Sequence, residues 1–191
     1  MKVWAFANQK GGVGKTTTTI TLAGLIAQQS KRVLMIDFDP HSSLTAYLGW
    51  DADTLDSSSY LLFDALSKNS LDYRICQRIL MRTPFKNLYL IPGSLALATL
   101  DKKLSKLDGM GLVLEKTLEL LKNDFDYVLI DCPPVVGILM VNALATCHHL
   151  IIPVQTEYLA LKGLERMMRT IEMIAKAKHQ KFSFTILPTM F

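Results

Sequence analysis

The chain has few cysteines, no long apolar run and little net charge. Its three cysteines, Cys76, Cys132 and Cys147, form no C-x-x-C pair among the 191 residues. This scatter argues against a disulfide framework and against a zinc or iron–sulfur site, and it is typical of proteins in a reducing cytosol. No apolar run reaches the roughly 18 residues of a membrane span, and the N-terminus becomes polar too early for a signal peptide. The net charge of +4 permits contact with an anionic polymer without demanding it.

Short apolar runs alternate with segments of helical periodicity along the whole chain. The expected strands cover residues 2–7, 32–37, 87–92, 127–132, 149–154 and 182–187. They are apolar at nearly every position, as expected for strands buried on both faces of a parallel sheet. The expected helices cover residues 16–29, 95–107, 111–122, 138–146 and 159–178, and residues 51–60 are loop-like. This alternation predicts an α/β fold, a doubly wound, mostly parallel sheet with helices on both faces.

We expect one domain over residues 1–191, truncated at its C-terminal end. The sequence stops at "FTILPTMF", just as the last expected strand finishes. An α/β domain normally follows such a strand with a helix.

A phosphate loop lies between the first strand and the first helix, in "NQKGGVGKTTTT". Gly14, Lys15 and Thr16 supply the second half of the pattern G-x-x-x-x-G-K-[ST]. The first glycine of that pattern would fall at Gln9, and adjacent glycines at 11 and 12 provide the flexible backbone instead. Glycines allow main-chain N–H groups to turn inward and approach phosphate oxygens closely.

The same loop predicts a nucleotide and magnesium site. Lys15 is expected to reach the β- and γ-phosphates, and the hydroxyl of Thr16 to bind Mg²⁺. The helix that follows adds its positive N-terminal end. The expected nucleotide-binding residues are Lys10, Gly11, Gly12, Val13, Gly14, Lys15, Thr16 and Thr17.

Five stretches of the sequence together resemble one ATPase family. "KGGVGKTT" is similar to the deviant phosphate loop of the ParA/Soj/MinD ATPases, and "VLMIDFDPHSSLTAYLG" to their second acidic motif. "FDYVLIDCPP" resembles their third motif, and "LIIPVQTEYLALKGL" with "ILPTMF" the strands and helix that follow. The resemblance covers essentially the whole chain. It implies a P-loop fold, ATP and Mg²⁺ as cofactors, and weak intrinsic hydrolysis of ATP to ADP and phosphate.

The resemblance also gives a role to the extra lysine of the loop. Lys10 corresponds to the signature lysine, which crosses a dimer interface to touch the nucleotide of the partner subunit. Two ATP-bearing faces would repel each other, and a lysine donated in trans offsets that charge only when ATP is present. The resemblance therefore implies a catalytic role for Lys10 in an ATP-dependent homodimer. The alternative for Lys10 is a solvated surface lysine.

Two carboxylates follow the second expected strand in "IDFDP". They stand at the carboxyl edge of a parallel sheet, where ligands bind. The resemblance implies that Asp39 positions and activates the attacking water and that Asp37 lies near the water shell of Mg²⁺. The alternative is that one of them caps a helix that begins near Ser42 or Ser43.

A third carboxylate, Asp131, ends the apolar strand "YVLID". This position suits a magnesium ligand that acts through water. Pro133 and Pro134 stiffen the following turn, which is a plausible switch that senses the γ-phosphate. Cys132 is expected to pack in the core.

One loop departs from the family pattern. Many ParA proteins read "DPQGNAT" where this chain reads "DPHSSLT", which puts partner contacts through this loop in doubt. The surrounding sequence is similar to that of ParA-like proteins encoded with chemotaxis genes. Those proteins place chemoreceptor arrays.

The sequence favours a ParA-like positioning ATPase in the bacterial cytoplasm, associated with the nucleoid or a pole. Such a protein binds DNA nonspecifically as an ATP-gated dimer, and a ParB-like or adaptor-type protein stimulates its slow hydrolysis. The alternatives are a membrane- or pole-associated regulator of the MinD or flagellar-number type, a metal-cluster or metabolic ATPase, and an adaptor that barely hydrolyses ATP. A membrane partner is not indicated.

The last expected helix carries several basic side chains. They form either one edge of a DNA-binding patch or a solvated helix face. These residues are Lys162, Arg166, Arg169, Lys176 and Lys178.

Overall fold

The computed structural model describes residues 1–104, 109–178 and 182–190. In this part of the chain, one sheet of seven strands runs in the order β3-β4-β2-β5-β1-β6-β7. All neighbouring strands are parallel except β3, which is antiparallel to β4. The strands are β1 (Lys2–Phe6), β2 (Val33–Asp37), β3 (Met81–Arg82), β4 (Leu88–Ile91), β5 (Tyr127–Asp131), β6 (His149–Gln155) and β7 (Phe184–Thr189).

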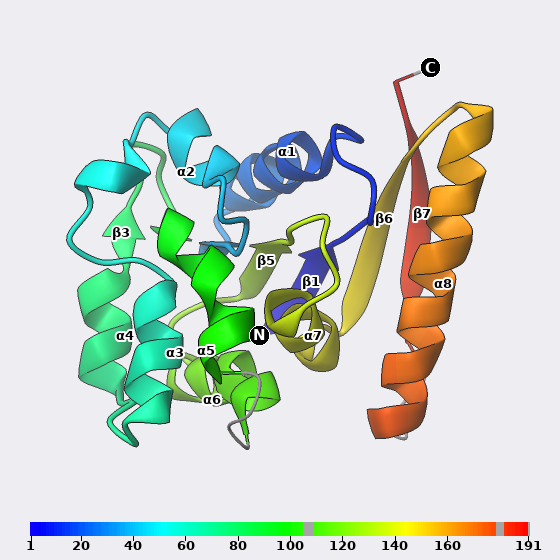
Figure 1. Cartoon of the computed structure of the whole chain (residues 1–191). Coiled ribbons are helices and arrows are strands. Elements are labelled where there is room, and N and C mark those ends of the chain that lie inside the picture. The colour runs from blue at the N-terminus through cyan, green and yellow to red at the C-terminus, as the bar shows by residue number, and fades with distance from the viewer. Residues whose placement is uncertain (105–108, 179–181, 191) are drawn as a thin grey trace.

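Helices cover both faces of this sheet (Figure 1). The α-helices are α1 (Lys15–Gln28), α2 (Ser43–Tyr47), α3 (Tyr60–Ser67), α4 (Tyr73–Ile79), α5 (Leu100–Leu104), α6 (Val113–Leu120), α7 (Ile138–Thr146) and α8 (Tyr158–Lys178). Short 3₁₀ turns cover Ala52–Thr54, Leu95–Thr99 and Met110–Leu112. The predicted doubly wound, mostly parallel α/β fold is confirmed.

Alternate side chains of the central strands build a separate core on each face. On one face, Phe6 and Met35 pack with Ala23 of α1 and Leu44 of α2. On the other face, side chains of β1, β2, β5 and β6 pack with α3, α4, α6, α7 and α8. Both cores are formed by side chains almost without solvent exposure. The central strands are therefore rigid supports for the loops at their carboxyl ends.

All six expected strands are present, within two residues of their expected ends. The expectation of burial on both faces is wrong for β7, where Phe184 is 40% exposed and Ile186 42%. This strand lies at the edge of the sheet, and α1 and α8 pack on β6 instead.

The expected helices are also present: α7 has its expected bounds, and α1, α6 and α8 differ from theirs by at most two residues at either end. The expected helix 95–107 is a 3₁₀ turn followed by α5, and residues 105–107 lie outside the described residues. The loop-like segment 51–60 holds one 3₁₀ turn and ends where α3 begins. Helices α3 and α4 and the two-residue strand β3 were not predicted from the sequence.

Candidate functional site

The loop between β1 and α1 has the backbone of a phosphate cradle. Gly12 and Gly14 have φ values of 73° and 87°, in the left-handed region that side chains disfavour. Gly14 is the N-cap of α1, so the loop leads directly into the N-terminal end of that helix. Val13 of the loop is buried, whereas Thr17, in the first turn of α1, is exposed. The backbone therefore fits an anion between the loop and the helix end.

Lys15 lies within this cradle. Its side chain is nearly buried, and its ammonium donates a hydrogen bond to the carbonyl oxygen of Lys10 at 3.2 Å. Burial lowers the pKa of Lys15, and the nearby carboxylates of Asp131 and Asp39 partly oppose that effect. A desolvated ammonium held by one carbonyl oxygen can exchange that partner for a phosphate oxygen.

Thr16 and Asp131 meet at the mouth of the loop. The Thr16 hydroxyl donates to Asp131 Oδ2 at 2.6 Å, which joins the first turn of α1 to the end of β5. Asp131 Oδ1 is buried without a hydrogen-bond partner in the described structure. Burial raises the pKa of Asp131 to about 7, while its bond to Thr16 acts in the opposite direction.

These two side chains fit a magnesium ion bound largely through water and phosphate. Mg²⁺ keeps several water ligands and uses few protein oxygens. Among the described residues, no cluster of three or more His, Cys, Asp or Glu side chains is arranged to hold a metal ion directly. The unpartnered Asp131 Oδ1 beside a hydroxyl is the kind of acceptor that a bound cation or its water would satisfy.

Asp37 is fully buried and faces α2. Its Oδ2 accepts hydrogen bonds from the Thr45 backbone N–H at 2.9 Å and from the Thr45 hydroxyl at 2.7 Å. Its Oδ1 accepts from the backbone N–H of Asp39 at 3.1 Å. Burial raises the pKa of Asp37 to about 6, although these hydrogen bonds lower it. These contacts are those of the helix-capping alternative, and the place of Asp37 in a magnesium water shell stays a prediction.

Asp39 lies in the turn after β2. Its Oδ1 accepts from the His41 backbone N–H at 3.0 Å, and the His41 imidazole Nδ1 lies 2.9 Å from the same oxygen. Asp39 lines a cavity of about 300 Å³ together with Pro133 and Pro134 of the turn after β5. The two motifs that the sequence singled out as a catalytic carboxylate and a switch therefore share one cavity.

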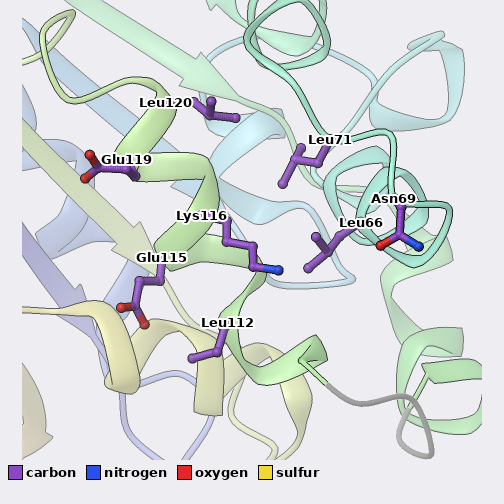
Figure 2. Close-up of a pocket in the computed structure, with 8 residues that line it drawn as sticks. All are labelled: Leu66, Asn69, Leu71, Leu112, Glu115, Lys116, Glu119 and Leu120. Carbon is purple, nitrogen blue, oxygen red and sulfur yellow. The ribbon is translucent and has the colours of Figure 1, made fainter.

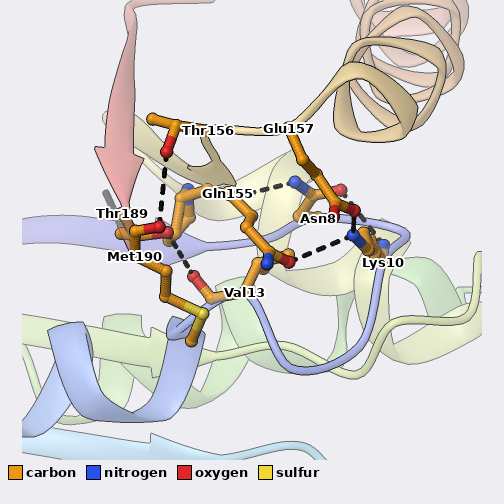
Figure 3. A network of polar contacts seen from close by, with 9 residues as sticks. Asn8, Lys10, Val13, Gln155, Thr156, Glu157, Thr189 and Met190 are labelled. Atoms are coloured by element: carbon orange, nitrogen blue, oxygen red, sulfur yellow. Dashed lines mark hydrogen bonds and ion pairs between the residues drawn. The ribbon is translucent and has the colours of Figure 1, made fainter.

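The ammonium of Lys10 is held within its own chain (Figure 3). It donates to Gln155 Oε1 at 3.1 Å and pairs with the carboxylate of Glu157. The Lys10 backbone N–H donates to Asn8 Oδ1 at 3.1 Å, and the Asn8 amide donates to the Pro153 carbonyl at 2.7 Å. This support from β6 was not predicted from the sequence, because no spacing rule links residues about 145 positions apart.

The end of β7 reaches the same loop (Figure 3). The Thr189 hydroxyl donates to the Val13 carbonyl at 2.9 Å. Thr156, after β6, donates through its hydroxyl to the Met190 carbonyl at 3.3 Å. Hydrogen bonds thus join the phosphate loop to the ends of β6 and of the edge strand β7.

A larger cavity of about 600 Å³ lies between α3 and α6, away from these residues (Figure 2). It is lined by Leu66, Asn69, Leu71, Leu112, Glu115, Lys116, Glu119 and Leu120. Half of these residues are leucines, and none belongs to the predicted phosphate loop or acidic motifs. The residues for which the sequence predicts nucleotide and magnesium binding lie instead at the carboxyl ends of β1, β2 and β5.

Comparisons with known proteins show which family the chain belongs to. A family model described as an AAA domain matches residues 1–184. The sporulation initiation inhibitor protein Soj of Bacillus subtilis is 38% identical over 177 residues, which cover 92% of this chain and 66% of Soj. The chromosome partitioning protein ParA of Myxococcus xanthus is 36% identical over 191 residues, which cover 100% of this chain and 65% of that ParA. This chain belongs to the ParA/Soj family.

A solved structure extends the likeness to three dimensions. Cobyrinic acid a,c-diamide synthase from Mycobacterium smegmatis, with bound ATP analogue and magnesium, superposes with a TM-score of 0.91 and is 35% identical. The match covers 100% of this chain and 75% of that one. The chain spans slightly less than two thirds of the length of Soj and ParA. Among the described residues, no helix is long and apolar enough to cross a membrane.

Proposed function

We propose that residues 1–191 form the nucleotide-binding domain of a positioning ATPase. This ATPase binds ATP with Mg²⁺, forms an ATP-dependent homodimer and binds DNA nonspecifically. A ParB-like or adaptor-type protein stimulates its slow hydrolysis, and the cycle segregates DNA or positions a protein cargo such as a chemoreceptor array. It acts in the bacterial cytoplasm, on the nucleoid or at a pole.

The observation that carries this proposal is the contact between Thr16 and Asp131 at the mouth of a glycine cradle. The hydroxyl and the carboxylate, 2.6 Å apart, stand beside the N-terminal end of α1 and the ammonium of Lys15. Thr16 and Asp131 would hold the magnesium ion, which when bound neutralises phosphate charge. The solved relative with a bound ATP analogue and magnesium supports this assignment.

The other residues at this edge of the sheet each have a separate role in binding and hydrolysis. Backbone N–H groups of Gly12 to Gly14 bind phosphate oxygens, and Lys15 turns from the Lys10 carbonyl to the β- and γ-phosphates. Asp39 orients the attacking water and accepts its proton. The side chain of Lys10 gives up its contacts with Gln155 and Glu157 and stabilises negative charge on the partner's nucleotide.

The DNA-binding part of the proposal concerns α8. Lys162, Arg166, Arg169 and Lys176 are exposed on this helix, although Glu165 and Glu172 are exposed as well. Lys178 is less available, because its ammonium pairs with Glu115 at 3.0 Å and donates to the Ala145 carbonyl at 3.0 Å. Phosphate contacts by such side chains are sequence-independent and weaken steeply with salt.

The test uses the complete protein with the substitution Asp39→Ala, which is expected to trap the ATP state. Its binding to random duplex DNA is measured with ATP and with ADP across a salt series. Salt-sensitive binding with ATP alone would support a DNA-based carrier. Absence of binding in both states would overturn the DNA step, and vesicles of anionic lipid would then test the membrane- or pole-associated regulator.

A further inference from the structure

We propose that His41 is a positioning residue for Asp39, and that its imidazole N–H fixes which carboxylate oxygen faces the attacking water. The inference rests on the proposed ATPase function, because it assigns a second residue to the work of Asp39. It concerns the position at which this chain departs from the glutamine of the family pattern.

Two hydrogen bonds from one residue end on the same oxygen of Asp39. The His41 backbone N–H lies 3.0 Å from Oδ1, and the imidazole Nδ1 lies 2.9 Å from it. A carboxylate can only accept, so Nδ1 must carry the proton in this contact. Within the described residues, the hydrogen bonds that reach this carboxylate all end on Oδ1. The second oxygen, Oδ2, is therefore the one left to accept from a water.

The backbone of the turn is fixed independently of the imidazole. The Asp39 backbone N–H donates to Asp37 Oδ1 at 3.1 Å, and the Ser42 backbone N–H donates to the Asp39 carbonyl at 2.8 Å. Ser42 has a φ of 53°, which turns the chain sharply into α2. Because these contacts hold the main chain, loss of the imidazole would leave Asp39 Oδ1 with the His41 backbone N–H as its donor, and would loosen the carboxylate without unfolding the turn.

Exposure and neighbours place this pair at the edge of the proposed reaction site. The Asp39 side chain is 14% exposed and the His41 side chain 81%, so the imidazole lies on the solvent side of the carboxylate that it contacts. Both residues line the cavity of about 300 Å³ that Pro133 and Pro134 also line. The charge of Asp39 raises the pKa of Lys15 and of Asp131, so this carboxylate lies near the phosphate loop.

The experiment compares two substitutions of nearly equal shape. In His41→Asn the amide nitrogen is attached to Cγ, as Nδ1 is in histidine, so it can donate to Oδ1. In His41→Leu the branched side chain has the same shape and no donor. We expect basal ATP turnover of the complete protein to retain its kcat in His41→Asn and to lose about fivefold in kcat in His41→Leu. The KM for ATP should stay within about twofold in both, because the imidazole touches no predicted phosphate ligand.

A stability measurement separates positioning from a general structural effect. His41→Leu should lower kcat while its urea unfolding midpoint stays that of the parent, because the main-chain contacts of the turn remain. Equal kcat for His41→Leu and the parent would overturn the inference, and so would equal losses in His41→Leu and His41→Asn. A parent protein that binds ATP and never hydrolyses it would instead overturn the proposed function.

Discussion

The ammonium of Lys10 pairs with the carboxylate of Glu157 in the same chain (Figure 3). The proposed function requires this ammonium to reach the nucleotide of a second subunit. The pair within the chain and the contact in the dimer therefore compete for one charge. The two side chains are 32% and 41% exposed, so the pair is partly screened by solvent and breaks at modest cost.

This competition predicts that Glu157→Gln favours the dimer. The neutral amide weakens the hold on Lys10, so the complete protein should dimerise with ATP at about threefold to tenfold lower protein concentration. Sedimentation velocity with ATP and with ADP measures this, in the Asp39→Ala background so that ATP persists. Lys10→Ala is the matched control, and it should prevent the ATP dimer with or without Glu157→Gln. Unchanged or weaker dimerisation of Glu157→Gln would refute the competition.

Lys15 and Lys10 are expected to respond differently to alanine substitution. Lys15→Ala removes the ammonium inside the cradle and should weaken binding of ATP with Mg²⁺ by at least about a hundredfold. Lys10→Ala should leave the affinity of one subunit within about threefold, because this ammonium points to Glu157 and Gln155. Isothermal titration calorimetry on both variants decides, and equal losses would contradict the division of roles.

Lys15→Ala should also leave the fold intact. The lost hydrogen bond to the Lys10 carbonyl is long, at 3.2 Å, and burial already disfavours the charge, as the lowered pKa of Lys15 indicates. We expect the free energy of unfolding to fall by no more than about 1 kcal/mol.

Gly93 is predicted to be intolerant of a side chain. A β-carbon there would lie 2.9 Å from Asp37 Cγ and 2.9 Å from Ser42 Oγ. Both neighbours are buried, and Asp37 is held by Thr45, so neither can move freely. Gly93→Ala should lower the free energy of unfolding by about 1–3 kcal/mol.

Gly24 in α1 provides the matched control for this substitution. A β-carbon at Gly24 meets nothing within 4 Å. Gly24→Ala should therefore raise the free energy of unfolding by about 0.5–1 kcal/mol, through helix propensity alone. Urea unfolding of both variants measures the two opposite changes in stability. An unchanged free energy of unfolding in Gly93→Ala would show that Asp37 and Ser42 can move away from the added β-carbon.

The sequence was sufficient for the parts of the fold that depend on local patterns. Runs such as "YVLID" predicted buried strands, and the glycines and Lys15 predicted the loop before α1. Because carboxyl ends of parallel strands meet at one edge, Asp131 could be expected near that loop. Its contact with Thr16 at 2.6 Å agrees with this reasoning.

Contacts that depend on tertiary packing could not be read in this way. Thr45 holds Asp37 from a short helix eight residues away, and Glu157 holds Lys10 from a distance of 147 residues. Neither partner has a spacing or composition that marks it. The exposure of β7 was missed for a similar reason, since an apolar strand reads alike at the centre and at the edge of a sheet.

The buried carboxylate of Asp131 predicts a pH-dependent stability in the absence of nucleotide. Burial raises its pKa from 3.8 to about 7, so between these values the folded chain binds more protons than the unfolded chain. The free energy of unfolding therefore falls as the pH rises through this window, and Asp37, with a pKa of about 6, adds the same sign. Asp131→Asn mimics the protonated form and removes the contribution of Asp131.

Asp131→Asn should consequently stabilise the nucleotide-free protein more near pH 8 than near pH 5, by about 2 kcal/mol. Urea unfolding of parent and variant at the two pH values measures the difference. Asp53→Asn, which removes an exposed carboxylate, controls for the change in net charge. An equal effect of Asp131→Asn at both pH values would mean that Asp131 is ionised in the folded chain throughout. The same substitution should weaken binding of ATP with Mg²⁺, because the carboxylate that destabilises the empty site is the one proposed to hold the cation.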